Sequence, residues 1–102
     1  MKAYAAPIGN SREDVEELRR LLLETGGRIF RVVFVSRGKN EPRDMRARLK
    51  RLSHGWHWND RRNLQFTVWD VQKKEWRVVP LERVAVFRCG SLEWVTKVGG
   101  QT

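Results

Sequence analysis

The sequence predicts an α+β domain in which one amphipathic helix near the N-terminus precedes a small antiparallel β-barrel of five to six strands. Apolar residues first recur at helical spacing, and further along they alternate with polar residues in several short runs separated by turns. The length of 102 residues suffices for one compact domain and is too short for two. We therefore expect a single domain over residues 1–98, followed by a flexible tail over residues 99–102.

The helix is expected over residues 12–25. Ser11 is a typical N-cap residue, and Asp14 follows at the third helical position, where an acidic side chain favours the start of a helix. A stripe of apolar residues then continues at helical spacing until Gly26 and Gly27 end the run: Val15, Leu18, Leu21 and Leu22. Such a helix packs either on its own barrel or on a second copy of the chain.

The first strand is expected over residues 28–35, with Phe30, Val32 and Phe34 on one face and Arg31 on the other. Residues 43–52 fit two patterns, because Met45 and Leu49 also line up on a helix. The alternation of apolar and basic residues is complete, however, and a turn that contains glycine precedes the segment. We therefore interpret it as a strand.

Two hairpins are expected in the last third of the chain. Residues 64–71 and 75–79 flank a polar turn, across which Trp69 and Trp76 are expected to pair. Residues 80–83 are expected to form a short turn or 3₁₀ segment. Strands over residues 84–88 and 92–98 then flank a small turn that contains Gly90.

The charge is strongly basic and unevenly distributed. The chain has 21 Lys and Arg against 12 Asp and Glu, a formal net charge of +9. Residues 28–62 hold 11 of these basic residues and only three acidic ones. The excess excludes an acidic mimic of DNA, and it indicates either an anionic partner or a surface that keeps the protein soluble.

The single cysteine, Cys89, cannot form an internal disulfide, which favours a reducing compartment. The N-terminal residues lack the apolar stretch of a signal peptide or a membrane span, so we expect a soluble cytoplasmic protein without membrane contact. His54 and His57 have no partner ligands at diagnostic spacing, so no metal site and no cofactor are expected.

The clearest candidate for binding is the alternating segment itself. On a strand, Arg46, Arg48 and Lys50 project from one face at intervals of about 7 Å, close to the phosphate spacing along a nucleic-acid strand. Further basic residues are expected to widen this surface: Arg31, Arg37, Lys39, Arg43, Arg51, Arg61 and Arg62. The alternative is a solvated basic face without a ligand.

An aromatic and basic loop follows at residues 54–58. Rings beside cations are what unpaired bases stack on, so Trp56, His57 and Trp58 are expected to contact bases. The alternative is that the two tryptophans fold back as a lid on the thin core.

The segments Val33 to Lys39 and Arg43 to Leu49, together with Val68-Trp69-Asp70 and the later Trp76-Arg77, resemble the WYL_2 family. This small family is mostly encoded by bacteriophages, and the resemblance implies an SH3-like (Sm-like) barrel in the cytoplasm of a host bacterium. Residues 76–84 are also similar to a Trp-Arg segment of larger WYL domains, which bind nucleotides or nucleic-acid strands. That similarity implies anion contact by Arg77 and, more weakly, by Arg83. The alternative is that each forms an exposed salt bridge to Glu75, Glu82 or Asp70.

The function we expect is nucleic-acid binding, DNA or RNA, by a small phage accessory protein that is a monomer by default, with a homodimer as the alternative. A different class is also open: a protein-interaction module that binds a host enzyme or a ribonucleoprotein, such as a polymerase or a CRISPR effector, because surface Trp and Arg residues dominate interface hot spots. No catalytic signature or phosphate-binding glycine loop is present in the sequence, so an enzyme is not expected.

Overall fold

The computed structural model describes residues 9–50, 59–60, 62 and 64–97. It consists of one helix followed by an antiparallel sheet, so the α+β class is confirmed. The elements are α1 (Arg12–Glu24), β1 (Phe30–Val35), β2 (Pro42–Arg48), β3 (Asn59–Asp60), β4 (Gln65–Asp70), β5 (Glu75–Pro80), a 3₁₀ turn (Leu81–Arg83), β6 (Val84–Cys89) and β7 (Leu92–Val95). Six strands of four to seven residues match the expected number, and the two-residue β3 is an additional strand that alternation did not indicate.

Helix α1 begins and ends where capping residues predict. The Ser11 Oγ accepts a hydrogen bond from the Asp14 N–H at 3.1 Å. At the other end the Thr25 Oγ1 donates to the Leu22 carbonyl at 2.7 Å, and Gly26 follows with a φ of 61° that ends the helix. The expected range of 12–25 is therefore correct to within one residue.

The apolar stripe of α1 is buried against the sheet of the same chain. All four residues predicted for it lie in the core: Val15, Leu18, Leu21 and Leu22. Their burial within the chain favours packing on its own sheet over packing on a second copy. The helix also buries Arg19, which is 1% exposed and has its Nε 3.5 Å from the Glu16 Oε2, a placement that the apolar spacing did not predict.

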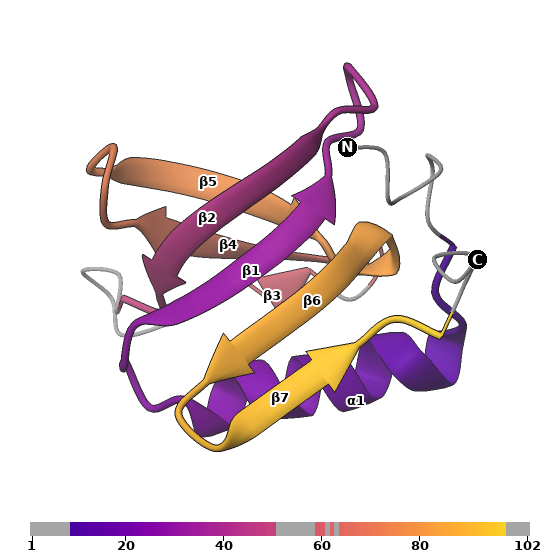
Figure 1. Ribbon diagram of the computed structural model, residues 1–102, viewed down its shortest axis with the longest axis horizontal. Coiled ribbons are helices and arrows are strands. Elements are labelled where there is room, and N and C mark those ends of the chain that lie inside the picture. The colour runs from indigo at the N-terminus through magenta and orange to yellow at the C-terminus, as the bar shows by residue number, and fades with distance from the viewer. Residues whose placement is uncertain (1–8, 51–58, 61, 63, 98–102) are drawn as a thin grey trace.

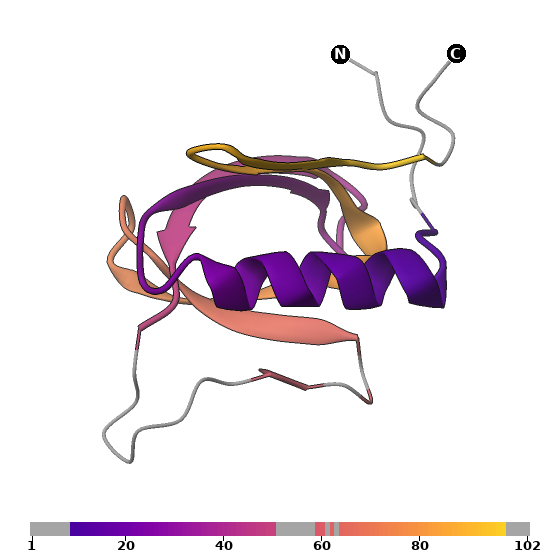
Figure 2. The same cartoon turned by 90° about the horizontal axis from the view of Figure 1, so that it is seen from below.

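The sheet has the strand order β3-β4-β2-β1-β6-β7, and β5 pairs with β4. Strand β4 holds β5 along one edge, and its other edge is shared by β2 at one end and β3 at the other. Figures 1 and 2 show β1, β2, β6 and β7 as one curved layer that faces β4, with α1 lying across an open side between them. The core occupies the space that the curved sheet and the helix enclose.

Alternation along the strands separates the core from the surface. In β1, Phe30, Val32 and Phe34 are buried and Arg31 is exposed, as predicted. The segment with two possible patterns is a strand, β2, which ends at Arg48 and is shorter than the expected 43–52. The expected strand over residues 64–71 is also shorter, because Leu64 adopts a φ of 53° and Val71 begins a turn. The expected strand 92–98 ends at Val95.

A buried asparagine fastens the start of α1 to the rest of the domain. The Asn10 Nδ2 donates to the carbonyls of Leu81 at 3.0 Å and Val84 at 2.9 Å. Its Oδ1 accepts from the Thr96 Oγ1 at 2.6 Å, and its backbone N–H donates to the Glu82 carbonyl at 2.9 Å. One side chain therefore joins three segments that are distant in the sequence.

Replacing this residue tests how much the fold depends on it. Asn10→Ala should lower the free energy of unfolding by about 2–4 kcal/mol, because two buried carbonyls lose their donors. Urea unfolding followed by circular dichroism measures the change. Gln72→Ala is the control, since the Gln72 side chain is exposed; an equal effect of the two substitutions would contradict the assigned role of Asn10.

Candidate nucleic-acid interface

The exposed face of β2 presents the cations that alternation predicts. Met45, Ala47 and Leu49 are buried, and the residues between and after them, Arg46, Arg48 and Lys50, are exposed. A strand sends successive side chains to opposite faces, and the apolar set is held in the core. Arg46 and Arg48 are therefore directed to the outside of the domain. Lys50 lies two residues beyond the end of β2 and is exposed after the buried Leu49.

Neighbouring strands extend this face with further charges. Arg46 of β2 lies opposite Arg31 of β1, and Arg31 lies opposite Arg88 of β6. Arg31 forms a bidentate pair with Asp44 at 2.9 and 2.7 Å, and Arg88 pairs with Glu93 at 3.1 Å. Arg88 was not predicted as a site residue, although the alternation of buried Phe87 and Cys89 around it indicates an outward side chain.

Arg46 and Arg48 differ from these two arginines. Within the part of the chain that the structure describes, their guanidinium groups form neither a hydrogen bond nor an ion pair. An arginine without a carboxylate partner keeps all five of its donors for a ligand. Arg46 and Arg48 therefore place two guanidinium groups, which form no ion pair with a described residue, side by side on the outward face of β2.

Aromatic rings lie beside these cations. Trp69 of β4 is the cross-strand partner of both Arg48 and Trp76. The rings of Trp69 and Trp76 meet edge to face, with centroids 5.2 Å apart at an interplanar angle of 79°, which confirms the predicted pairing across the hairpin. The Lys50 Nζ lies 3.9 Å from the centroid of the Trp69 ring, a cation–π contact.

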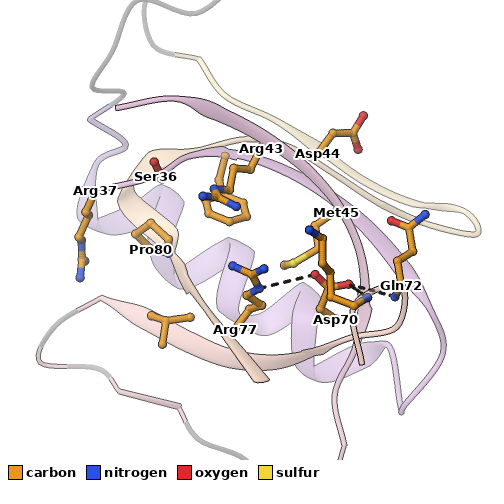
Figure 3. Close-up of a pocket in the computed structure, with 12 residues that line it drawn as sticks. Ser36, Arg37, Arg43, Asp44, Met45, Asp70, Gln72, Arg77 and Pro80 are labelled. Carbon is orange, nitrogen blue, oxygen red and sulfur yellow. Dashed lines mark hydrogen bonds and ion pairs between the residues drawn. The ribbon is translucent and has the colours of Figure 1, made fainter. Parts of the chain in front are cut away.

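A second group of predicted residues lines a pocket of about 450 Å³ between β2 and β5. Figure 3 shows the side chains of Arg43 and Arg77 directed into this space, whereas Asp44 points away from it. Arg43 is exposed, but it belongs to the side of β2 opposite to Arg46, so alternation separates it from the basic face. The sequence pattern predicted that Arg43 and Arg46 share one surface. In the structure Arg43 lines this pocket, and Arg46 lies on the opposite side of β2.

Arg77 is held by acidic neighbours at this pocket. Its Nη2 lies 2.7 Å from the Glu75 Oε2, and its Nε lies 3.7 Å from the Asp70 Oδ2. Asp70 is buried, and its Oδ1 accepts the backbone N–H groups of Gln72 and Lys73 at 3.0 Å each. The Trp-Asp and Trp-Arg dipeptides of the sequence motif are therefore in contact with each other across the β4–β5 hairpin.

The remaining predicted residues lie elsewhere. Arg37 and Lys39 belong to the β1–β2 turn, at the end of β2 away from Arg48, and Arg37 forms a bidentate pair with Glu82 at 2.9–3.1 Å. Arg62 is exposed near β4. The predicted residues Arg51, Trp56, His57, Trp58 and Arg61, with His54, lie outside the described residues.

Arg83 is also a structural residue. Its Nη1 donates to the Ser36 carbonyl at 3.2 Å and to the Asn40 Oδ1 at 2.8 Å, which ties the 3₁₀ turn to the β1–β2 turn. Cys89 is buried, and its Sγ lies 3.6 Å from the Ile29 carbonyl. Over residues 9–50, 59–60, 62 and 64–97, no three His, Cys, Asp or Glu side chains are grouped to hold a metal ion.

Comparisons of the chain with protein families, characterised proteins and solved structures gave no significant match. No helix among the residues described is long and apolar enough to cross a membrane.

The ion pair between Arg31 and Asp44 changes the pKa of the Asp44 carboxyl, which lies on the same side of β2 as Arg46. Hydrogen bonding to Arg31 lowers the pKa of the Asp44 carboxyl, and the nearby charge of Arg46 acts in the same direction. A carboxyl whose pKa is lower in the folded chain stabilises the fold above its unfolded pKa, and this contribution disappears as the pH falls through the folded pKa. The pair is exposed, so its contribution is about 0–1 kcal/mol.

The lowered pKa of Asp44 predicts that the free energy of unfolding depends less on pH in a variant without this carboxylate. Between pH 7 and pH 3, Asp44→Asn should lose less unfolding free energy than the wild-type chain, because it has no carboxylate to protonate. Urea unfolding at the two pH values measures the difference. Glu41→Gln removes a carboxylate that has no ion pair within the described part of the chain, so it should behave like the wild type. A full wild-type difference in Asp44→Asn would contradict a role for this pair.

Proposed function

We propose that this protein binds nucleic acid, without catalysis, through the exposed face of β2. The observation that supports the proposal is that Arg46 and Arg48 form no hydrogen bond or ion pair with a described residue, while their neighbours Arg31 and Arg88 do. Asp44 interacts with Arg46 only through its charge, beyond ion-pair distance. A face whose only role is solubility gains nothing from this separation, whereas phosphate oxygens need arginines with unoccupied donors. Contacts to phosphates do not depend on the base sequence, so the binding is expected to be sequence-tolerant.

We further propose that the domain is an SH3-like barrel of the WYL_2 type and that it acts as a phage accessory protein in the host cytoplasm. The curvature of the sheet around one core and the contacts between the Trp-Asp and Trp-Arg dipeptides support this proposal. Small barrels of this size leave one side open, and here α1 covers it. Under this proposal the helix completes the core and the outer face of the barrel remains available for a ligand.

Charge reversal on β2 is the direct test. Arg46→Glu/Arg48→Glu should weaken binding about 100-fold or more, because two charge-assisted contacts are replaced by repulsion. Fluorescence anisotropy against labelled single- and double-stranded DNA and RNA, across about 50 to 200 mM salt, measures the affinity and its salt dependence.

The matched control makes the same change of charge elsewhere. Arg12→Glu/Lys97→Glu alters two exposed cations near the start of α1. Lys97→Glu also removes the 3.8 Å ion pair with Asp14, a surface pair that contributes about 0–1 kcal/mol, so circular dichroism checks that the variant is folded. The double variant should keep most of the affinity. If both double variants bind equally, the assigned face is wrong. If the wild-type chain binds none of the four nucleic acids, the proposal fails and the face is better explained as a docking surface for a host protein.

Removing the acidic residue of the face should have the opposite effect. Asp44 stands two residues before Arg46 on the same side of β2, about 7 Å away along the strand. Asp44→Asn should raise the affinity by about two- to fivefold, since one repulsive charge near the phosphates is lost. The same titration measures it, with Glu41→Gln as a control for net charge alone; an equal gain in both variants would contradict a local effect.

A further inference from the structure

We propose that Trp76 is a base-stacking platform beside the basic face, so that the ligand of this protein is a single strand with unpaired bases. The inference depends on the proposed function and specifies the form of nucleic acid that the same site takes. Trp76 of β5 is a further candidate for this role beside Trp56, His57 and Trp58, which lie outside the described residues.

Trp76 has the exposure and the support that a platform needs. Its side chain is 41% exposed, and the residue at the next outward position of β5, Val78, is 46% exposed. The Trp69 ring packs against the Trp76 ring edge to face, with the two ring centroids 5.2 Å apart, and so restricts its orientation. Trp69 itself is half-buried and carries the Lys50 ammonium on its ring. The Trp69 ring is thus occupied by contacts within the protein, whereas the Trp76 ring remains accessible to a ligand.

Arg48 lies in the same cross-strand row as the Trp76 ring. Cross-strand pairing places Arg48, Trp69 and Trp76 in one row across β2, β4 and β5. Two strand spacings separate Arg48 from Trp76, about 10 Å, which corresponds to about three nucleotides at the axial rise of about 3.4 Å in a stacked strand. A chain that runs across the strands therefore reaches Arg48 with a phosphate and Trp76 with a base.

The geometry favours a single strand over a duplex. In a duplex the faces of the bases are covered by their neighbours in the stack, so a ring on a sheet surface has no base face to contact. Phosphates alone, in contrast, are present in both forms and attract Arg46 and Arg48 equally. A preference for single strands is therefore the property that Trp76 is expected to supply.

The experiment separates bases from phosphates. Anisotropy titrations compare an oligothymidylate with an abasic oligomer of equal length, which keeps every phosphate and lacks the bases. The wild-type chain should bind the oligothymidylate about tenfold more tightly or better, since stacking on an aromatic side chain supplies such a difference. In Trp76→Leu, which keeps an apolar side chain without a ring, this preference should fall to about twofold or less.

Two further variants control the measurement. Trp76→Phe restores a ring and should recover most of the preference for bases. Leu23→Ala shortens another exposed apolar side chain, on α1, and should leave the preference at the wild-type value. The slope of log affinity against log salt should be equal in the wild type and in Trp76→Leu, because the number of phosphates neutralised is the same.

The outcomes distinguish the two proposals. If wild-type protein binds both oligomers equally, or if Trp76→Leu keeps the full preference, the platform is wrong while the phosphate-binding face stands. If the wild type binds neither oligomer, the proposed function itself fails. Because the first comparison uses only the wild-type chain, a failure of Trp76→Leu to fold leaves the inference testable.

Discussion

The apolar core, enclosed by the curved sheet and by helix α1, is the constraint on which the other described features of this domain depend. The strands have one face against this core, so each apolar residue directed inward forces its neighbour outward. Phe30, Val32 and Phe34 thereby direct Arg31 to the surface, and Met45 and Ala47 do the same for Arg46. The buried apolar residues of α1 and the hydrogen bonds of Asn10 to Leu81 and Val84 stabilise the sheet in this arrangement.

The cations that reach the surface have two different fates. Arg37 pairs with Glu82 between the β1–β2 turn and the 3₁₀ turn, and Arg77 pairs with Glu75 and Asp70 in the β4–β5 hairpin. These residues hold loops and hairpins in place, where exposed pairs contribute little energy but restrict geometry. Arg46 and Arg48 lie in the second half of β2, which ends at Arg48, and form no ion pair with a described residue. The positions of the acidic residues thus separate arginines that are paired within the fold from those, such as Arg46 and Arg48, that form no ion pair with a described residue.

Basic and aromatic side chains meet on the outer face because β4 lies between β2 and β5. Pairing with β2 brings Arg48 opposite Trp69, and pairing with β5 brings Trp76 to the other side of the same ring. The Lys50 ammonium then completes the cluster above Trp69. Arginine and lysine supply positive charge and hydrogen-bond donors that suit phosphates. Tryptophan supplies a flat apolar surface on which bases can stack.

Local periodicity was enough to predict the helix, the alternation of β2 and the outward direction of Arg46, Arg48 and Lys50, because these features follow from residues within one turn or one strand. It was also enough to pair Trp69 with Trp76 across a short hairpin. It did not reveal that Arg31 and Arg37 are occupied by Asp44 and Glu82, that Arg43 faces a separate pocket, or that Lys50 covers Trp69. Those facts depend on strand pairing and on contacts between distant segments, and a pattern along the chain contains no information about which carboxylate lies beside which arginine.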